Sequence, residues 1–264
     1  MKLVVLVDNT APRGLECEHG FSLYAEVGGS KILIDTGASD MFARNAQKLG
    51  VDLAGVHAAV LTHGHDDHAG GLMKFASMNR NARIYAREGF DCDYFNIHGK
   101  YIGVDKRIAN LRQLVITRSE TVVEEQVRVF GDFAGVPSGD NLGLKKMYNG
   151  ELVQDDFSHE QGVALWEGDK RVLVTGCAHN GVENMILRSK ELYGVLPQVV
   201  VSGFHLRHVD ESRKEEIEAL GRRLAEMGVV FYTGHCTSRE AFAYLKPILG
   251  DNLQNFTVGT VIEI

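Results

Sequence analysis

The chain has 264 residues, of which 44% are hydrophobic and 24% are charged, so it is long enough to bury a substantial core. Its formal net charge of −7 and its pI near 5.9 argue against a general nucleic-acid-binding surface. Apolar runs such as residues 3–7 and 199–201 are far too short to cross a bilayer, and the N-terminal apolar stretch is too short for a signal peptide. We therefore expect neither a nucleic acid nor a membrane as a partner.

The four cysteines are scattered along the chain and form no Cys-x-x-Cys pair. A disulfide framework is not expected in a chain of this size, so a reducing cytoplasm is the default location. Two of the four, Cys177 and Cys236, sit beside a histidine in a glycine-rich loop, which sets them apart from Cys17 and Cys92.

Strand-like segments dominate the first half of the chain. The predicted strands are 3–7, 21–27, 31–35, 58–61, 83–86, 113–117 and 127–130, and the predicted helices are 40–49 and about 69–78. We expect Ser39 or Asp40 to cap the first of these helices and Gly50 to end it.

The second half alternates strands with helices. Residues 131–154 are rich in glycine and polar residues and fit no regular element, which is consistent with a lid or an ordered excursion over a site. After them we predict a hairpin of strands 162–166 and 171–175, strands 199–202, 229–233 and 260–264, and helices 182–192, 212–227 and 238–249. This order of elements suggests two sheets packed together with helices outside.

The stretch His63-Gly64-His65-Asp66-Asp67-His68 places three imidazoles and two carboxylates directly after a predicted strand. A lone histidine is usually solvated or part of a core, but three within six residues favour a metal site. Imidazole nitrogen and carboxylate oxygen suit zinc, and also iron or manganese. Gly70 and Gly71 let the backbone fold closely around an ion before the next helix begins. We predict a metal centre here, with two ions.

Three further loops repeat one pattern, in which a strand is followed by a small residue, a glycine and a histidine. They carry His179, His205 and His235. A single loop of this kind is more simply explained as a tight turn with a solvent-facing histidine. Three of them favour a shared site, because loops at strand ends display chemistry on a rigid scaffold.

Asp35 also ends an apolar run, at residues 32–34. Its carboxylate either orients a ligand histidine through the second ring nitrogen or caps the helix that follows. His159 lies in a stretch polar enough to line a site, but no spacing supports it as a ligand. The remaining histidines, for which we expect surface or core positions, are His19, His57, His98 and His208.

With Asp35-Thr36-Gly37 and Thr62-His63-Gly64-His65-Asp66-Asp67-His68-Ala69-Gly70-Gly71, the chain resembles the metallo-β-lactamase superfamily over nearly its whole length. The resemblance implies an α+β fold, a four-layer αββα sandwich, in which residues 1–264 form a single domain of two similar halves. It also implies Zn²⁺ as the cofactor, one or two ions, with iron or manganese as alternatives. The implied ligands are His63, His65 and His179 for the first metal and Asp67, His68 and His235 for the second, while Asp35 matches a motif that binds no metal.

The loops around Cys177, His205 and Cys236 narrow the resemblance to the branch of 7,8-dihydropterin-6-methyl-4-(β-D-ribofuranosyl)-aminobenzene-5′-phosphate synthase, which is associated with methanopterin biosynthesis. Many superfamily members carry an Asp after a strand in the second half, where its carboxylate bridges the two metals. Here that strand ends in Thr175-Gly176-Cys177, and no acidic residue occurs before Glu183. Cys177, His205 or a water alone would then bridge the ions, and we expect the second ion to bind more weakly.

These observations predict a cytoplasmic, metal-dependent hydrolase or phosphate-displacing transferase. It would act on a phosphate ester or diphosphate of a small molecule, with a pterin as one candidate, and work as a monomer or homo-oligomer. The metal would lower the pKa of a bound water to about 7. Asp67 would hold a metal and orient that nucleophile, and His205 would contact the substrate or donate a proton.

Two rival functions remain open at this point. One is hydrolysis of a lactone, thioester or amide by the same metal centre. The other is a non-catalytic binding or sensor module in which the metal is structural. Three protein ligands plus an open position would favour catalysis, and a closed tetrahedral site would favour the sensor.

Overall fold

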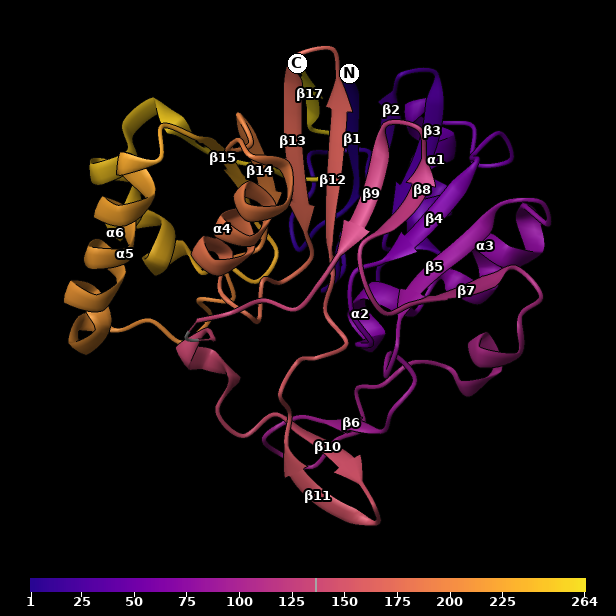
Figure 1. Cartoon of the computed structure of the whole chain (residues 1–264), viewed down its shortest axis with the longest axis horizontal. Coiled ribbons are helices and arrows are strands. Elements are labelled where there is room, and N and C mark those ends of the chain that lie inside the picture. The colour runs from indigo at the N-terminus through magenta and orange to yellow at the C-terminus, as the bar shows by residue number, and fades with distance from the viewer. Residues whose placement is uncertain (136) are drawn as a thin grey trace.

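Two seven-stranded sheets pack face to face, and helices cover the outer face of each (Figure 1). This computed structural model describes residues 1–135 and 137–264. The predicted α+β fold, a four-layer αββα sandwich, is confirmed by this arrangement. Within those described ranges, no helix combines the length and the apolar character that crossing a membrane requires.

The first sheet has the strand order β17-β1-β2-β3-β4-β5-β7, so the last strand of the chain pairs with the first. Its strands are β1 (Lys2–Val7), β2 (Ser22–Val27), β3 (Ser30–Ile34), β4 (Ala58–Leu61), β5 (Arg83–Arg87), β7 (Leu114–Thr117) and β17 (Val261–Glu263). The accompanying helices are α1 (Met41–Leu49), α2 (Asp66–Ala69), α3 (Leu72–Met78) and the 3₁₀ helix η1 (Lys106–Asn110). Strands β3, β4, β5 and β7 are parallel, so their carboxyl ends lie at one edge of the sheet.

The second sheet has the order β16-β15-β14-β13-β12-β9-β8. Its strands are β8 (Thr121–Glu124), β9 (Val127–Phe130), β12 (Gly162–Glu167), β13 (Lys170–Thr175), β14 (Val199–Ser202), β15 (Val230–Thr233) and β16 (Leu253–Asn255). The accompanying helices are α4 (Val182–Tyr193), α5 (Lys214–Glu226) and α6 (Arg239–Leu249), with the 3₁₀ helices η3 (Glu211–Arg213) and η4 (Gly250–Asn252). Strands β13 to β16 are parallel, and their carboxyl ends also share one edge.

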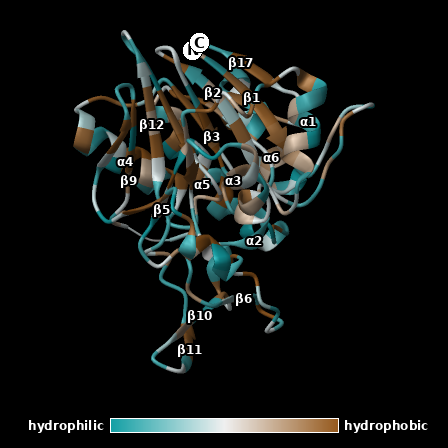
Figure 2. Ribbon diagram, turned by 90° about the vertical axis from the view of Figure 1, so that its right-hand side faces the viewer, coloured by the Kyte–Doolittle hydropathy of each residue, from teal (hydrophilic) through white to brown (hydrophobic). Residues whose placement is uncertain are grey.

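A small three-stranded sheet projects from the sandwich (Figure 1, Figure 2). It pairs β10 (Lys145–Tyr148) with both β6 (Tyr94–Phe95) and β11 (Glu151–Gln154), and all its pairs are antiparallel. The 3₁₀ helix η2 (Gly139–Asn141) precedes it. The stretch 131–154 is thus an ordered excursion from the sandwich, except for residue 136, which lies outside the described residues.

The burial pattern of the strands explains the layers. Successive side chains of a strand point to opposite faces, so an unbroken apolar run is buried on both sides. In β1, Leu3 and Val5 belong to the core between the two sheets, together with Val163 of the second sheet. Val4 and Leu6 point the other way and pack in a cluster with residues of α1 and α3. A third cluster packs α4, α5 and α6 onto the second sheet.

Two predicted helices differ from the structure. The helix expected at about 69–78 is interrupted, because Gly70 and Gly71 separate α2 from α3. A Cβ atom at Gly70 would lie 2.1 Å from the backbone oxygen of Ala38, so the chain passes too close here for any other residue. The helix expected at 212–227 begins with the 3₁₀ turn of η3. The strands that the sequence pattern did not predict are β6, β8, β10, β11 and β16.

Candidate metal centre

Three histidines converge where the carboxyl ends of β4 and β13 meet. The ligand atoms of His63, His65 and His179 lie within 4.8 Å of one another, and all three residues are buried. Their Nε2 atoms have no hydrogen-bond partner among the described residues. Leaving a buried polar atom unpaired costs about 1–3 kcal/mol, so three in one place need a common partner. A metal ion fits this donor set, and we call these three residues the first cluster.

In two members of the first cluster, polar side chains hold the ring nitrogen opposite Nε2. His63 Nδ1 lies 3.0 Å from the hydroxyl of Thr62, and His179 Nδ1 lies 2.9 Å from Oδ1 of Asn141. Asn141 also donates from Nδ2 to the carbonyl of His179 at 2.7 Å. Such contacts fix the tautomer in which Nε2 is free to bind a metal.

A second cluster, formed by Asp67, His68 and His235, lies beside the first. Oδ2 of Asp67 is 3.4 Å from Nε2 of His235 and 4.0 Å from Nε2 of His68. The two imidazole Nε2 atoms are 3.2 Å apart. His19, for which we expected a surface or core position, is exposed and lies 3.2 Å from the same oxygen of Asp67. The six predicted ligands are therefore brought to one edge of the sandwich.

Asp35 is placed to orient His68. Its Oδ2 lies 2.7 Å from Nδ1 of His68 and accepts a hydrogen bond from the hydroxyl of Thr62 at 2.7 Å, while Oδ1 accepts from the amide of Thr62 at 2.7 Å. Asp40, not Asp35, is the N-cap of α1. Of the two roles that the sequence left open, the geometry favours orientation of a ligand histidine.

Cys177 lies between the two clusters. Its Sγ is 3.2 Å from Nε2 of His68, and it forms a possible ligand group with His63 and His68. It follows β13, where the expected bridging carboxylate is missing. The two sheets approach closely at this point, since a Cβ at Gly176 would lie 2.2 Å from the hydroxyl of Thr62.

His159 supports the first cluster through the backbone. Its Nδ1 accepts a hydrogen bond from the amide of Gly64 at 2.9 Å, and Nε2 lies 3.1 Å from Oδ2 of Asp155. Both ring nitrogens are thus engaged within the protein. The neighbouring Glu160 is buried and accepts from the amides of His179 and Asn180, each at 2.8 Å. Burial raises the pKa of Glu160, against the effect of these hydrogen bonds.

Burial and local charge divide the histidines into two protonation classes. Burial lowers the pKa of His63 and His179 well below the ordinary value, and that of His65 to about 3. For His68, burial acts in the same direction, but the charges of Asp35 and Asp67 overcome it and raise its pKa to about 9. The first cluster is therefore neutral at pH 7, as metal ligation requires.

Asp67 is held in its ionised form. Desolvation alone would raise its pKa, but the charge of His68 and hydrogen bonds from His19 and His235 bring it well below the usual range. A carboxylate is the form in which Asp binds a metal or accepts a proton.

Strained backbone marks the loops that carry the site. The φ angles of Asp35, Ala178, His205 and His235 are 57°, 55°, 47° and 48°, in the left-handed region that favours glycine. Each costs on the order of 1–3 kcal/mol and persists only where the surroundings enforce it. His235 shows one such constraint, since its amide donates to Oδ1 of Asp8 at 2.8 Å.

A cavity of about 170 Å³ opens onto both clusters. Two cationic side chains, Lys100 and Arg207, line it beside His65, Asp67 and His205. The loop that carries Lys100 is tied to the histidine motif, because the amide of Asp66 donates to the carbonyl of Ile102 at 2.8 Å. The cavity thus combines candidate metal ligands with positive charge.

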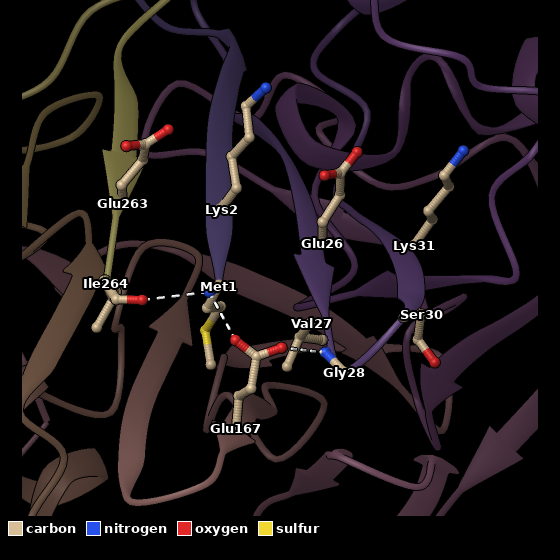
Figure 3. A pocket seen from close by; sticks show the side chains of 11 residues that line it. Met1, Lys2, Glu26, Val27, Gly28, Ser30, Lys31, Glu167, Glu263 and Ile264 are labelled. Carbon is tan, nitrogen blue, oxygen red and sulfur yellow. Dashed lines mark hydrogen bonds and ion pairs between the residues drawn. The ribbon is translucent and has the colours of Figure 1, made fainter.

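A larger cavity, of about 590 Å³, lies at the opposite end of the strands (Figure 3). It includes Ser30 at the start of β3, whereas Asp35 follows the end of that strand. The amino group of Met1 is paired there with Glu167 at 2.7 Å. No histidine or cysteine is among its described lining residues, so it is not a candidate metal centre.

The sandwich and its histidine-rich edge define a metallo-β-lactamase-fold protein, and residues 15–108 match the model of the metallo-beta-lactamase superfamily. The resemblance predicted from the histidine motif is therefore confirmed. The crystal structure of a metal-dependent hydrolase of the beta-lactamase superfamily superposes with a TM-score of 0.85, at 29% identity over 100% of this chain and 99% of that one.

Two proteins of Methanocaldococcus jannaschii are similar over most of their length. One is uncharacterized and is 27% identical over 98% of each chain. The other is 7,8-dihydropterin-6-methyl-4-(beta-D-ribofuranosyl)-aminobenzene-5′-phosphate synthase, which is 25% identical over 93% of this chain and 90% of its own.

Several residues of the site carry no signal in the sequence. Asn141 and Glu160 position His179, and Lys100 and Arg207 line the cavity, yet none belongs to a recognisable motif. They come from segments far apart in the chain, and only the folded structure brings them together.

Proposed function

We propose that the chain is a metal-dependent enzyme, a hydrolase or phosphate-displacing transferase, that acts on a phosphate ester or diphosphate of a small molecule. The observation that carries this proposal is the cavity in which Lys100 and Arg207 stand beside His65, Asp67 and His205. Lysine and arginine are the usual partners of phosphate oxygens in proteins. Their position beside the candidate ligands favours a substrate whose phosphate reaches the metal centre.

The donor sets fit zinc, with iron or manganese as alternatives. His63, His65 and His179 would hold one ion, and Asp67, His68 and His235 the other. When bound, such ions supply Lewis-acid polarisation of a phosphoryl oxygen and activate a water molecule. The adjoining cavity leaves room for a substrate, which favours a catalytic centre over a closed structural one.

The chain's own residues supply orientation and proton transfer. Asp67 remains ionised and can orient an attacking water by accepting its proton in a hydrogen bond. His205 is buried but lines the cavity, and we assign it the proton donated to the leaving group. Asp35 keeps His68 in the orientation that directs Nε2 toward the second cluster.

A phosphorylated pterin is the candidate substrate class. The name of the 25% identical synthase contains both a dihydropterin and a 5′-phosphate. We propose that this chain also acts on a compound of this class, a small phosphorylated molecule of the cytoplasm. The cationic pair at the cavity supports the phosphate part of this assignment.

The test is a substrate screen on protein reconstituted separately with Zn²⁺, Mn²⁺ or Fe²⁺. The panel contains phosphate monoesters, diphosphates, a lactone, a thioester and an amide. We expect turnover of the phosphate compounds that is abolished by chelation and in a His63→Ala, His65→Ala double variant, which should also lose most of its metal. Turnover confined to the lactone, thioester or amide would replace the proposed substrate class. Stoichiometric metal in the double variant would refute the ligand assignment.

A further inference from the structure

Two buried cysteines lie beside His205 and have no role in the proposed chemistry. Cys177, Cys236 and His205 are each only 3% exposed. One ligand atom from each lies within 4.8 Å of the other two, which makes them a third possible metal-binding group. Two sulfur atoms and one imidazole differ in chemistry from the ligands of the first and second clusters.

The topology brings these three side chains together. They follow β13, β14 and β15, three neighbouring parallel strands in which Thr175 is in register with Ser202 and Ser202 with Thr233. Cys177, His205 and Cys236 thus stand two or three residues beyond the same level of the sheet. Because parallel strands present their carboxyl ends at one edge, their side chains meet there.

The backbone leaves room for the sulfur of Cys236. A Cβ atom at Gly203 would lie 2.3 Å from this Sγ, so only glycine allows the sulfur to occupy its position. The same sulfur accepts a hydrogen bond from the amide of His205 at 3.3 Å. Its distance from the carbonyl oxygen of Cys177 is 3.6 Å. The thiol of Cys236 is therefore held between the other two members of the group.

The imidazole of His205 provides independent evidence for a bound ligand, because one of its ring nitrogens lacks a partner. Its Nδ1 is buried and has no hydrogen-bond partner in the described part of the chain. The residue is also held at a φ of 47°, a conformation that costs a non-glycine residue on the order of 1–3 kcal/mol. An unpaired buried nitrogen beside two thiols is an unfavourable arrangement unless something binds all three.

We propose that Cys177, Cys236 and Nδ1 of His205 form a thiophilic metal site that takes Zn²⁺ or a chemically similar ion such as Cd²⁺. Thiolate and imidazole are the ligands that such ions prefer. Binding replaces the two thiol protons, which are released to solvent, and changes no oxidation state. The site adjoins the second cluster, because Cys177 Sγ is 3.2 Å from Nε2 of His68.

Ligation through Nδ1 would restrict His205 to one part of its proposed catalytic role. The metal-bound ring stays neutral, so its Nε2–H can donate a hydrogen bond to the leaving group but is a far weaker acid than an imidazolium. The ring lines the cavity, so an ion at Nδ1 fixes its orientation and leaves Nε2 as the nitrogen that can face a substrate. The metal-site proposal does not depend on that catalytic part. It stands even if the enzyme acts on a substrate other than a phosphate.

The experiment is a Cd²⁺ titration of the metal-free, full-length protein, followed by the ultraviolet charge-transfer absorbance of thiolate bound to cadmium. A Cys17→Ser, Cys92→Ser background removes the two thiols outside the group and should leave the signal unchanged. In that background we expect an absorbance that corresponds to two thiolates. Cys236→Ala should reduce it by about half, as the loss of one of two sulfur ligands requires.

Two further variants separate this site from the others. His63→Ala with His65→Ala should keep the two-thiolate absorbance, because these histidines belong to the first cluster. His205→Gln should keep both thiolates but weaken Cd²⁺ binding by about tenfold or more. Circular dichroism checks that each variant is folded, and Cys236→Ser replaces Cys236→Ala if the latter is not.

Three results would overturn the proposal. The first is a Cd²⁺ absorbance that is unchanged by loss of Cys236, which would leave Cys177 as a ligand of the neighbouring cluster only. The second is unchanged Cd²⁺ affinity in His205→Gln. The third is a count of two rather than four free thiols in the unfolded, unreduced protein, because a disulfide between Cys177 and Cys236 would leave no thiolate for a metal.

Discussion

Hydrogen bonds from single side chains fix which ring nitrogen of His63, His68 and His179 faces the metal centre. Asp35 is buried, and its two oxygens contact Nδ1 of His68 and both donors of Thr62. In Asp35→Asn, one oxygen is replaced by an amide that cannot accept these bonds. At a pH above about 9, where His68 carries no competing proton, we expect the affinity of the second ion to fall by about 10–100-fold while that of the first is unchanged.

Equilibrium dialysis followed by elemental analysis would measure both affinities of the Asp35 variant. Asp40→Asn is the matched control, because Asp40 is exposed and lies at the start of α1. Equal loss of both ions, or no loss of either, would show that Asp35 does not act through His68.

His205→Ala tests proton donation to the leaving group. Its ring lines the cavity beside the cationic side chains, and a positioned general acid typically contributes about 10²–10⁴-fold to the rate. We expect a loss of turnover in this range with an alkyl phosphate. The loss should be much smaller with a nitrophenyl phosphate, because nitrophenolate leaves without a proton. The ratio of the two losses, measured by steady-state kinetics, is the diagnostic quantity.

An equal loss of turnover with both phosphates would contradict proton donation by His205. It would indicate that the residue acts on metal binding or on structure instead. Metal content alone does not distinguish these roles, since Nδ1 of the same ring belongs to the proposed thiophilic site.

The sequence could indicate the ligands but not the residues that position them. His63, His65 and His68 stand within one motif, and His179, His205 and His235 follow strands, so their common edge could be predicted from the positions of the strands. Asn141 carries no such signal, because it belongs to a 3₁₀ turn in a segment without periodicity. Its contact with His179 depends on a chain path that only tertiary structure defines.

At the scale of elements, the break between α2 and α3 is a requirement of packing. In Gly70→Ala, the new Cβ would lie 2.1 Å from the oxygen and 2.3 Å from the carbon of the Ala38 carbonyl, so backbone must move. We expect the free energy of unfolding of the metal-free protein to fall by about 1–3 kcal/mol, as for other overpacked sites. Urea denaturation followed by circular dichroism would measure it.

Gly221→Ala in α5 is the matched control for Gly70→Ala. The nearest atom to its new Cβ is Cδ2 of Leu245 at 3.1 Å, the end of a flexible side chain. Alanine also has a helix propensity about 1 kcal/mol better than glycine, which offsets this contact. A Gly70→Ala variant as stable as this control would mean that the α2–α3 turn can relax.

The loop between β6 and the first 3₁₀ helix brings a cation to the cavity. Lys100 is fixed through its backbone, since its amide donates to Oδ1 of Asn96 at 3.0 Å. We expect Lys100→Ala to raise KM for a phosphate substrate about tenfold, because a hydrogen bond to a charged group contributes about 1.5–3 kcal/mol. The KM of an uncharged ester should not change. Steady-state kinetics with both substrates would measure this difference.

Lys145→Ala serves as the control for Lys100→Ala. Lys145 is exposed on β10, outside the cavity, and its replacement removes the same charge from the small sheet that contains β6, the strand before the Lys100 loop. If both variants raised KM equally, general electrostatic attraction would explain the effect. Lys100 would then have no specific contact with phosphate.

The strands that could not be predicted from the sequence are short, and they form only because neighbouring strands pair with them. The central strands are apolar runs that are buried on both faces, as in β4, and their pattern alone indicates them. In contrast, β6 has two residues and β16 has three, too few for a period to be detected. The hairpin of β10 and β11 has mostly exposed or half-buried residues, so no apolar alternation marks it.

At the scale of the whole molecule, stability and chemistry depend on different parts of the two sheets. The core between them is made of apolar side chains, whereas the buried histidines and carboxylates gather at one edge. Residues of both halves of the chain form each cluster, as His63 with His179 and Asp67 with His235. We therefore expect metal binding and the stability of the sandwich to be coupled, because an ion that binds only the folded state stabilises it.

The protonation states of the histidines at this edge predict that the affinities of the two ions depend differently on pH. His65, with a pKa of about 3, and the other members of the first cluster are neutral near pH 7, so no proton competes with the first ion. His68, with a pKa of about 9, is protonated there and must lose the proton on Nε2 to bind the second ion. Its raised pKa means that this competition is strongest at low pH and ends as the pH rises through about 9.

Mn²⁺ is the suitable probe for this prediction, because thiolates bind it poorly. We expect the affinity of the first ion to be constant between about pH 6 and 9, while that of the second rises about tenfold per pH unit, the dependence that release of one proton produces. Calorimetric titration across this range would give both constants, and proton release measured in buffers of different ionisation enthalpy would count the proton directly. Identical pH slopes for the two ions would contradict the assignment of His68 to the second ion. In the folded Asp35→Asn variant the slope of the second ion should flatten, because the carboxylate that raises the pKa of His68 is gone.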